Sequence, residues 1–520
     1  MHFYPLRALT TSVVAIRHSV LTCSLLLCAL GSHAAGALPA DVLATLARAG
    51  VPRDAMSVMV QAVQAPGADS TKSVRLVATS AASSATAADP GAAPQSASPV
   101  AYRLTHREDA RQNPASVMKL VTTYTALNTL GADYTWKNRI GIDGIIVAGN
   151  ILEGNLVVRG SGDPKLVLER LQALFAKVQA KGIREIRGDI ILDRSIFNVP
   201  DKNPADFDDE PLRPYNAAPD GLLVNFKSLI FTFTPDPANQ RVLVKYEPPI
   251  AGVDIPTELP LTNGNCGDWK ANLKADFFTP TKVSFAGRYS AACGEKVWPV
   301  AYSEPRAYAA RVIQAMWLAS GGTLTGTVRE DASPRTTKVL FNAESLPLAD
   351  IIADINKFSN NVMAQQVFLT LSAQGKRASF EASQRFVADW WKKTLPGVAA
   401  PLIENGSGLS RKERTSVASL TALLQHAAAS PQAAVFASSL GLAGVDGTVQ
   451  RMKDRNAESI ALGNAQLKTG TLRDVVSVAG YATGLSGQRY CVVAIINHPN
   501  AAAARGALDK LVEWTIKDTP

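Results

Sequence analysis

The chain has 520 residues, 47% of them hydrophobic and 19% charged, which excludes a disordered chain and provides apolar material for large cores in two or three domains. The formal net charge of +9 suits an anionic cell-wall polymer or a membrane surface as a peripheral partner. No cluster of Lys and Arg is interleaved with aromatic residues, so the sequence predicts no nucleic-acid partner.

Residues 1–34 have the pattern of a secretory leader. They contain Arg7 and Arg17 but no Asp or Glu, then an apolar run over 20–30, then small residues before a cleavage point after Ala34. We therefore expect a cleaved signal peptide and a periplasmic mature protein. An uncleaved anchor is the alternative, although the run is short for a transmembrane span and no later stretch reaches about 18 apolar residues.

The elements after the leader predict a hairpin followed by a helix. Apolar patterning predicts a short helix over 40–49 and a strand over 56–62. Residues 78–99 are mostly Ala, Ser, Pro, Gly and Thr, which cannot bury enough apolar surface to become ordered, so we expect a flexible surface loop there. A second strand over 100–104 completes the hairpin, and apolar residues with helical spacing begin at Ser116.

A long insertion follows this helix. Strands are predicted over 136–147, 151–160 and 183–192, with a helix over 166–181. Residues 198–300 are rich in proline and are expected to be irregular. The insertion divides one catalytic domain into an N-terminal segment, predicted over 35–128, and a C-terminal segment, predicted over 337–520. The inserted domains are predicted over 129–336.

Three cysteines remain after removal of the leader. Cys266 and Cys293 lie 27 positions apart in the loop-rich segment, so an exported protein is expected to pair them in a disulfide that stabilises the fold by about 3.5 kcal/mol. Cys491 lies in Tyr-Cys-Val-Val-Ala-Ile-Ile, the pattern of a buried strand, and is expected to be an inert core thiol.

The C-terminal segment predicts a long helix, three strands and a closing helix. The first helix is expected over 348–374, where it carries or follows Ser359. Consecutive antiparallel strands are expected over 465–472, 476–482 and 490–496. The closing helix is expected over 502–516.

Three short motifs lie on these elements in a fixed order: Ser116-Val-Met-Lys119, Ser359-Asn360-Asn361 and Lys468-Thr469-Gly470. Each arises by chance in a chain of this length. Together, in this order, they match the signature of serine acyl-transferases of the penicillin-binding and β-lactamase type. Pro114 suits a helix start, which places Ser116 and Lys119 on one face of the first turn.

The first two motifs supply a nucleophile and its proton carriers. Lys119 is expected to be the base that takes the proton of the Ser116 hydroxyl, because a serine is a poor nucleophile without such a neighbour. The helix start also directs backbone N–H groups toward the serine oxygen, which supplies half of an oxyanion hole. The Ser359 hydroxyl is expected to relay a proton to the departing amine, and the Asn361 amide to orient the substrate.

The third motif predicts a substrate-binding edge strand. Lys468 and the hydroxyls of Thr469 and Thr471 would form a pocket for a carboxylate, Gly470 would let substrate approach closely, and the Thr471 N–H would complete the oxyanion hole. A second cation disfavours the ammonium form of a buried lysine. Lys468 is therefore also expected to keep Lys119 basic.

Other catalytic patterns are missing from the sequence. It contains no H-E-x-x-H, no G-x-S-x-G and no P-loop, so we predict no metal and no cofactor. The mature chain has three histidines, His106, His426 and His498, and none lies beside a motif. A Ser-His-Asp triad is therefore not expected.

With these motifs the chain resembles the D-alanyl-D-alanine carboxypeptidase/endopeptidase family, the class C low-molecular-mass penicillin-binding proteins. The resemblance covers nearly the whole mature chain and includes segments 160–164, 405–411 and 444–448 with Arg451, which serve equally well as structural turns. We assign none of them a direct catalytic role. The family often has Gly at the position of Ser161 and Asp at that of Asn405, so fine substrate preference is left open.

The resemblance implies a multidomain α/β fold. Its transpeptidase domain, like that of penicillin-binding proteins and serine β-lactamases, has five antiparallel strands flanked by helices and carries one or two inserted β-rich domains. The implied reaction is D-Ala-D-Ala carboxypeptidase or D-Ala-meso-diaminopimelate endopeptidase cleavage of peptidoglycan stem peptides, through an acyl-enzyme on Ser116 that β-lactam antibiotics also form. The role of the insertion, dimerisation and the balance of the two activities are left open.

Two alternatives are weighed against this interpretation. A serine β-lactamase or esterase of the same fold is the nearest in chemistry, but the Glu-x-x-Leu-Asn pattern that supplies a deacylating base in class A β-lactamases is not found. A catalytically silent wall-binding protein is the other. The intact Ser116, Lys119 and Lys468 argue against it.

Overall fold

The computed structural model describes residues 36–64, 102–147, 149–373 and 375–519. The predicted leader and the predicted loop over 78–99 lie outside the described residues. Within the described segments of the chain, no helix is both long enough and apolar enough to cross a membrane.

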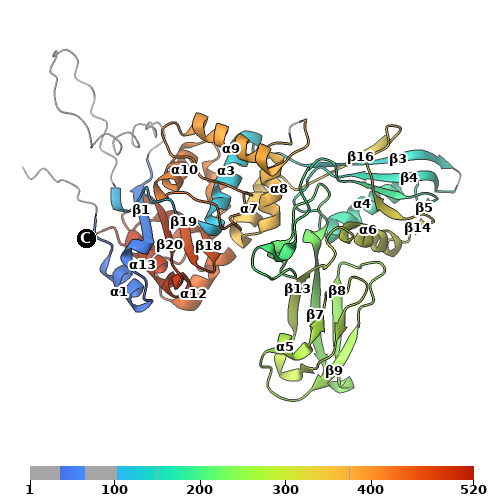
Figure 1. The fold of residues 1–520 in the computed structure, drawn as a ribbon, viewed down its shortest axis with the longest axis horizontal. Helices are drawn as coiled ribbons and strands as arrows, with labels where there is room; N and C mark the ends of the chain where they lie inside the picture. The colour runs from blue at the N-terminus through green and yellow to red at the C-terminus, as the bar shows by residue number, and fades with distance from the viewer. Residues whose placement is uncertain (1–35, 65–101, 148, 374, 520) are drawn as a thin grey trace, which may run out of the picture. The chain divides into compact units, whose positions relative to one another are not determined.

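An antiparallel sheet joins the two segments of the chain that flank the insertion (Figure 1). Its strands in spatial order are β17 (Gly441–Leu442), β18 (Ala465–Leu472), β19 (Val475–Thr483), β20 (Arg489–Asn497), β1 (Met56–Ala62) and β2 (Tyr102–His106). β1 and β2 form the predicted hairpin pair, and β18, β19 and β20 are consecutive antiparallel neighbours. The five predicted strands are confirmed, and the short β17 pairs with the outer side of β18.

Helices cover both faces of this sheet. On one face lie α1 (Ala40–Arg48) and α13 (Arg505–Ile516), and on the other α3 (Lys119–Leu130) and α10 (Val417–Ala429). Neighbouring residues of β20 show why the strand is apolar throughout, because Val492 belongs to the core under α13 and Val493 to the core under α3. Successive side chains of a strand point to opposite faces, and here both faces are buried.

The helix predicted over 348–374 is two helices, so that prediction was wrong at its centre. The first, α7 (Leu348–Phe358), ends where Ser359 adopts a left-handed backbone conformation with φ 59° and ψ 33°. The second, α8 (Asn361–Thr370), starts with Asn360 as its N-cap, whose side chain accepts a hydrogen bond from a backbone N–H of the first turn. The break therefore places Ser359 and Asn361 at two helix ends.

The first inserted sheet packs with α4 (Leu168–Ala180) and α6 (Tyr308–Ala319) in one apolar core. Its strands are β14 (Thr323–Leu324), β5 (Glu185–Ile186), β4 (Ile151–Arg159), β3 (Lys137–Val147), β16 (Lys338–Glu344), β6 (Ile190–Asp193) and β15 (Val328–Glu330). The strand predicted over 183–192 is interrupted between β5 and β6. A Cβ on Gly188 would lie 2.6 Å from the backbone oxygen of Gly154, so this close approach requires glycine.

The pairing of β16 bears on where the predicted insertion ends. β16 lies beyond the predicted boundary at residue 336, yet it pairs antiparallel with β3 of the inserted sheet. The division into domains stays a prediction. This pairing favours an end of the insertion after Glu344.

The segment predicted to be irregular over 198–300 contains a second sheet, so that prediction was wrong. Its strands are β12 (Tyr289–Ser290), β9 (Glu258–Thr262), β8 (Arg241–Glu247), β7 (Ser228–Asp236) and β13 (Lys296–Ala301). Alternate residues Phe231 and Phe233 of β7 are fully buried among other aromatic rings, which gives the sheet a core. Pro299 is tolerated because its strand, β13, lies at an edge of the sheet.

The predicted disulfide is confirmed, because Cys266 and Cys293 are bonded beside this second sheet. Cys491 is a free, buried thiol in β20. Burial raises the pKa of Cys491, so this thiol carries little of the thiolate that would make it reactive.

Candidate active site

Ser116 and Lys119 lie at the junction of two short structures. Ser116 is in the 3-10 turn η2 (Ala115–Met118), and Lys119 is the first residue of α3. The two side chains meet as predicted, with 3.0 Å between Lys119 Nζ and Ser116 Oγ. The turn that carries Ser116 is therefore tighter than the α-helical turn expected, but it places the two groups on one face.

The Lys119 amine is fully buried and has three polar neighbours. Besides Ser116 it contacts Asn361 Oδ1 at 2.6 Å and the backbone oxygen of Ser407. A neutral amine has two N–H groups and one lone pair. If Asn361 and Ser407 accept the two N–H groups, the lone pair is left for the Ser116 hydroxyl, which is the arrangement that a general base requires.

The electrostatic surroundings favour this neutral form. Burial lowers the pKa of Lys119 well below its usual value, and the nearby charge of Lys468 lowers it further, whereas Glu413 raises it. The direction of this shift supports the expectation that Lys468 keeps Lys119 basic, which stays a prediction. The larger cause of the lowered pKa is burial.

Ser359 contacts the third motif. Its hydroxyl lies 2.8 Å from Lys468 Nζ, which also lies 2.5 Å from the backbone oxygen of Thr469. Burial lowers the pKa of Lys468 to about 7. A bound anion would favour its ammonium form, so Lys468 is suited to respond to a substrate carboxylate.

Gly470 is required by the protein's own backbone. A Cβ at this position would clash with the Ser477 hydroxyl, would lie 2.6 Å from the backbone oxygen of Pro114 and would lie 3.0 Å from the Ser116 nitrogen. Ser477 also donates a hydrogen bond of 2.6 Å to Pro114. The glycine that was predicted to admit substrate therefore also lets β18 dock against the turn that carries the nucleophile.

A cleft of about 900 Å³ brings the motifs together at the edge of β18. It is lined by Ser116, Ser359, Thr469, Gly470 and Thr471. Lys119, Asn361 and Lys468 are buried directly behind these residues. All eight predicted catalytic and substrate-binding residues thus meet at one site.

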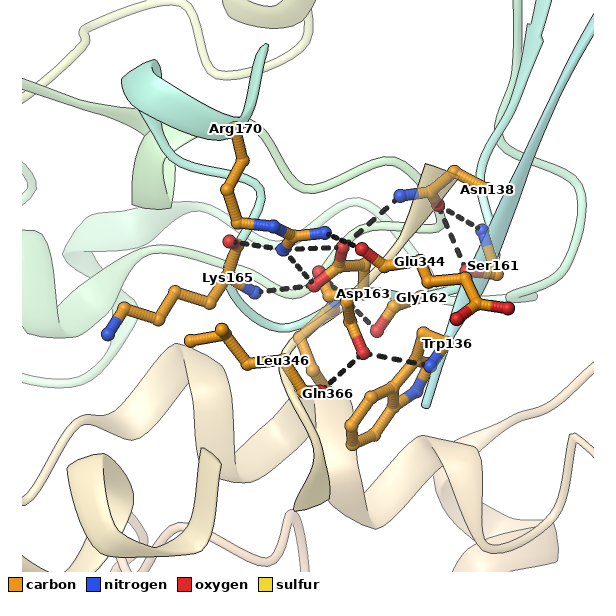
Figure 2. Close-up of polar contacts among 11 residues, drawn as sticks. Trp136, Asn138, Ser161, Gly162, Asp163, Lys165, Arg170, Glu344, Leu346 and Gln366 are labelled. Atoms are coloured by element: carbon orange, nitrogen blue, oxygen red, sulfur yellow. Dashed lines mark hydrogen bonds and ion pairs between the residues drawn. The ribbon is translucent and has the colours of Figure 1, made fainter. Parts of the chain in front are cut away.

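The segment over 160–164 ties the insertion to the helix that begins at Asn361 (Figure 2). Asp163 is buried and lies 2.8 Å from the Arg170 guanidinium, although burial still raises the pKa of Asp163. Beside it, Gln366 of α8 donates a hydrogen bond of 3.1 Å to the Gly162 oxygen. These contacts favour a structural role for the segment over 160–164.

The segment over 405–411 forms a tight turn under the nucleophile. Asn405 Oδ1 accepts hydrogen bonds from the Ser407 backbone N–H at 2.9 Å and from its hydroxyl at 2.7 Å, which positions the Ser407 oxygen against Lys119. The asparagine therefore supplies the acceptor that this turn needs. A Cβ on Gly408 would clash with the Ala115 backbone.

The segment over 444–448 closes another side of the cleft. Asp446 forms an ion pair of 2.7 Å with Lys357 at the end of α7. The hydroxyls of Thr448 and Thr469 lie 2.7 Å apart, so this segment contacts the substrate-binding strand directly.

Two contributors were not predicted from the sequence. The Tyr215 backbone oxygen accepts a hydrogen bond of 3.1 Å from Asn361 Nδ2, so a residue of the predicted insertion holds this amide in place. Glu413 is fully buried near Lys119. The polar pattern of the segment that follows Arg411 gives no sign that a carboxyl group would be buried there.

The pKa of the buried Glu413 carboxyl lies close to neutral pH. One carboxyl oxygen accepts N–H groups of Glu404 and Asn405 at 2.9 and 3.2 Å, and among the described residues the other has no hydrogen-bond partner. Burial raises the pKa of Glu413 to about 7. A glutamine at position 413 would keep the acceptor oxygen but would have no ionisable group.

We expect the stability of the Glu413→Gln variant to differ from wild type only at the higher pH. The pKa of Glu413 is higher in the folded state than in the unfolded state. Its contribution to the stability of the fold is therefore fully present below about pH 4.5 and is lost as the pH rises through about 7. The variant should gain a few degrees in Tm over wild type at pH 8 and almost none at pH 5. Calorimetry at the two pH values checks this, and a gain that is equal at both would contradict it.

Comparison with known proteins identifies the family. Residues 77–517 match the D-Ala-D-Ala carboxypeptidase 3 (S13) family. The chain belongs to this family. Its members are serine peptidases, so the chain is a hydrolase of the predicted class, and the resemblance inferred from the three motifs is confirmed.

Individual relatives cover most of the chain. It is similar to the D-alanyl-D-alanine carboxypeptidase DacB of Haemophilus influenzae, 26% identical over 392 residues, which are 74% of this chain and 80% of the relative. It is equally similar to a D-alanyl-D-alanine carboxypeptidase of Actinomadura sp., 26% identical over 409 residues, which are 75% of this chain and 74% of the relative. The crystal structure of penicillin-binding protein 4 from Haemophilus influenzae matches with a TM-score of 0.68 at 20% identity over 91% of this chain and 99% of that one. The predicted fold is confirmed.

Proposed function

We propose that this protein cleaves the D-Ala-D-Ala bond of peptidoglycan stem peptides, and the D-Ala-meso-diaminopimelate bond of their cross-links, through an acyl-enzyme on Ser116. The observation that carries the proposal is the buried Lys119 amine, whose contacts to Asn361 and Ser407 leave its lone pair for the Ser116 hydroxyl. Penicillin would acylate the same serine, because its lactam amide lies beside a free carboxylate like that of a terminal D-alanine.

Acylation follows from this geometry. Lys119 takes the proton of Ser116 as Oγ attacks the carbonyl carbon, and the backbone N–H groups of Ser116 and Thr471 stabilise the oxyanion. The Ser359 hydroxyl, held by Lys468, gives its proton to the departing amine and takes up the proton that Lys119 received, so Lys119 is neutral again. Water then enters and attacks the ester, with Lys119 again as the base.

The β-lactamase alternative is less well supported. Efficient hydrolysis of the penicilloyl ester in class A enzymes uses a glutamate that activates water. Among the described residues that line the cleft, the acidic side chain is Asp509, and it is paired with Arg455. Glu413 is buried behind Lys119. We therefore propose a long-lived penicilloyl-enzyme.

The cellular setting is proposed from the family and the sequence. A protein that acts on peptidoglycan works outside the cytoplasmic membrane, in agreement with the predicted leader over 1–34, and we propose the periplasm. Peripheral association with wall or membrane is supported by the positive net charge. Homodimerisation stays a prediction.

The substrate carboxylate provides a direct test. In a terminal D-alanine and in cross-linked diaminopimelate alike, a carboxylate lies one carbon from the scissile nitrogen, so the strand over 468–471 meets the same anion in both substrates. Amidating this carboxylate, or the Lys468→Ala substitution, should lower kcat/KM for both substrates by similar factors of about tenfold or more, as expected for a lost charge-assisted contact. Steady-state kinetics on matched synthetic peptides provide the measurement. Unchanged cleavage of the amidated peptides would remove the carboxylate pocket from the proposal.

A further inference from the structure

A buried carboxyl group near the general base has no part in the reaction described above. Glu413 is fully buried and does not line the cleft. One of its carboxyl oxygens accepts two backbone N–H groups, whereas among the described residues the other has no hydrogen-bond partner. Burial of a carboxyl oxygen without a hydrogen bond destabilises a folded protein. Such a group calls for an explanation, and a role in catalysis is one.

The satisfied oxygen of Glu413 is connected to Lys119 through a short series of hydrogen bonds. It accepts the backbone N–H groups of Glu404 and Asn405. The side chain of Asn405 accepts the N–H group of Ser407 at 2.9 Å, and the Ser407 backbone oxygen accepts an N–H group of Lys119. Glu413 therefore holds the turn that presents one of the two acceptors of the Lys119 amine.

The charge of Glu413 also acts on the base. Glu413 raises the pKa of Lys119, against the lowering caused by burial and by Lys468. The interaction is reciprocal, since Lys119 lowers the pKa of Glu413. Charges at buried positions interact strongly because little solvent screens them. A carboxylate at position 413 therefore favours the ammonium form of Lys119.

The ammonium form is the one that acylation creates. As Ser116 Oγ attacks the substrate carbonyl carbon, its proton moves to Lys119 Nζ, and a neutral amine becomes an ammonium group at a fully buried position. A buried charge without a counter-charge is unfavourable, and the nearby cation Lys468 makes it more so. A carboxylate that is already ionised and fixed in place would offset this effect.

We propose that Glu413 is a positioning residue of the reaction, which holds the turn against Lys119 and, as a carboxylate, supplies the counter-charge that stabilises the Lys119 ammonium group during acylation. No proton passes to Glu413. The proton that Lys119 receives leaves through Ser359, as described above, and Glu413 does not contact the substrate. This inference rests on the proposed function and adds to it the group that tunes its base.

The effect of Glu413 on the reaction should depend on pH. Burial raises the pKa of Glu413 to about 7, so the carboxylate is present at pH 8 and nearly absent at pH 5. Two charged groups act on it, Glu404, which raises the pKa of Glu413, and Lys119, which lowers it. Glu404 itself lies 3.6 Å from the exposed Lys412. The counter-charge therefore assists acylation at pH 8 and is missing at pH 5.

The rate of penicillin acylation at pH 5 and pH 8, measured by stopped flow, tests the proposal. Glu413→Gln keeps an acceptor for the turn but cannot ionise. It should react about three- to tenfold more slowly than the wild type at pH 8 and within about twofold of it at pH 5. Glu413→Asp keeps a carboxylate and should recover part of the rate at pH 8. Calorimetry at both pH values verifies that each variant is folded.

Two further variants show whether the effect acts through Lys119. Glu513→Gln is the matched control, because Glu513 is a buried carboxyl group of α13 that accepts a hydrogen bond of 2.6 Å from Ser459 and does not line the cleft. It should match the wild-type rate at both pH values. In a Lys119→Met background, Glu413→Gln should lower the rate no further, as in a double-mutant cycle.

Several results would overturn the counter-charge. They are equal losses for Glu413→Gln at pH 5 and pH 8, which would leave Glu413 a structural role only, a wild-type rate for this variant at pH 8, an aspartate variant no faster than the glutamine variant, and a loss that persists without Lys119. A wild type that forms no penicillin adduct on Ser116 would instead overturn the proposed function.

Discussion

The Ser116→Ala variant is expected to form no covalent adduct with penicillin and to lose peptide turnover by several orders of magnitude. Loss of a nucleophile in comparable serine enzymes costs on the order of 10⁶ in kcat. The Lys119 amine, the cleft and the carboxylate pocket all remain in this variant, but no oxygen is left to form the ester. Intact-mass spectrometry with and without penicillin, followed by peptide mapping of the wild-type adduct, provides the measurement.

The matched control is Ser438→Ala, which removes an exposed hydroxyl from α11 (Ala433–Ser438), outside the cleft. It should react with penicillin at the wild-type rate and to the same final mass. An adduct on the Ser116→Ala variant, or a wild-type adduct that maps to another serine, would show that the nucleophile has been misassigned.

The catalytic core could be predicted from the sequence because its residues are close together in short motifs on regular elements. Lys119 follows Ser116 by one helical turn, so local spacing alone brings the two side chains together. The β18 strand has the bounds that its apolar pattern predicts, and Lys468 lies on it. Such contacts depend on periodicity, which a sequence displays directly.

The features that could not be predicted depend on single backbone conformations or on distant contacts. Ser359 interrupts a run with continuous helical character, and nothing in its neighbours signals the left-handed conformation that separates α7 from α8. The acceptor that fixes Asn361 is the backbone oxygen of Tyr215, 146 positions away. Every residue type has a backbone carbonyl, so the sequence does not indicate which one will accept this hydrogen bond.

The second inserted sheet was missed for a different reason. Proline and glycine are frequent over 198–300, and they normally indicate loops. The alternation of Leu229, Phe231 and Phe233 was the usable signal, because alternate apolar residues are typical of a strand with one buried face. The composition of the surrounding segment hid this short pattern.

The Lys119→Met variant should keep the fold and lose the base. Methionine has nearly the shape of the lysine side chain, so the buried space stays filled, but the Ser116 hydroxyl has no proton acceptor. We expect the rates of penicillin acylation and of peptide cleavage to fall by about 10² to 10⁴-fold, the usual contribution of a general base. Stopped-flow acylation and circular dichroism measure the two properties.

The pH dependence separates loss of a base from loss of structure. In the wild type, Lys119 works only when neutral, so acylation slows as the pH falls through its lowered pKa. The Lys119→Met variant should lack this decrease of the rate at low pH, the acid limb of the pH profile. The Lys468→Ala variant should keep the limb and move it to higher pH, because removal of the neighbouring cation raises the pKa of Lys119. If Lys119→Met kept the wild-type decrease of the acylation rate at low pH, the titrating group would be another residue. If Lys468→Ala moved this decrease to lower pH, the charge of Lys468 would not act on Lys119.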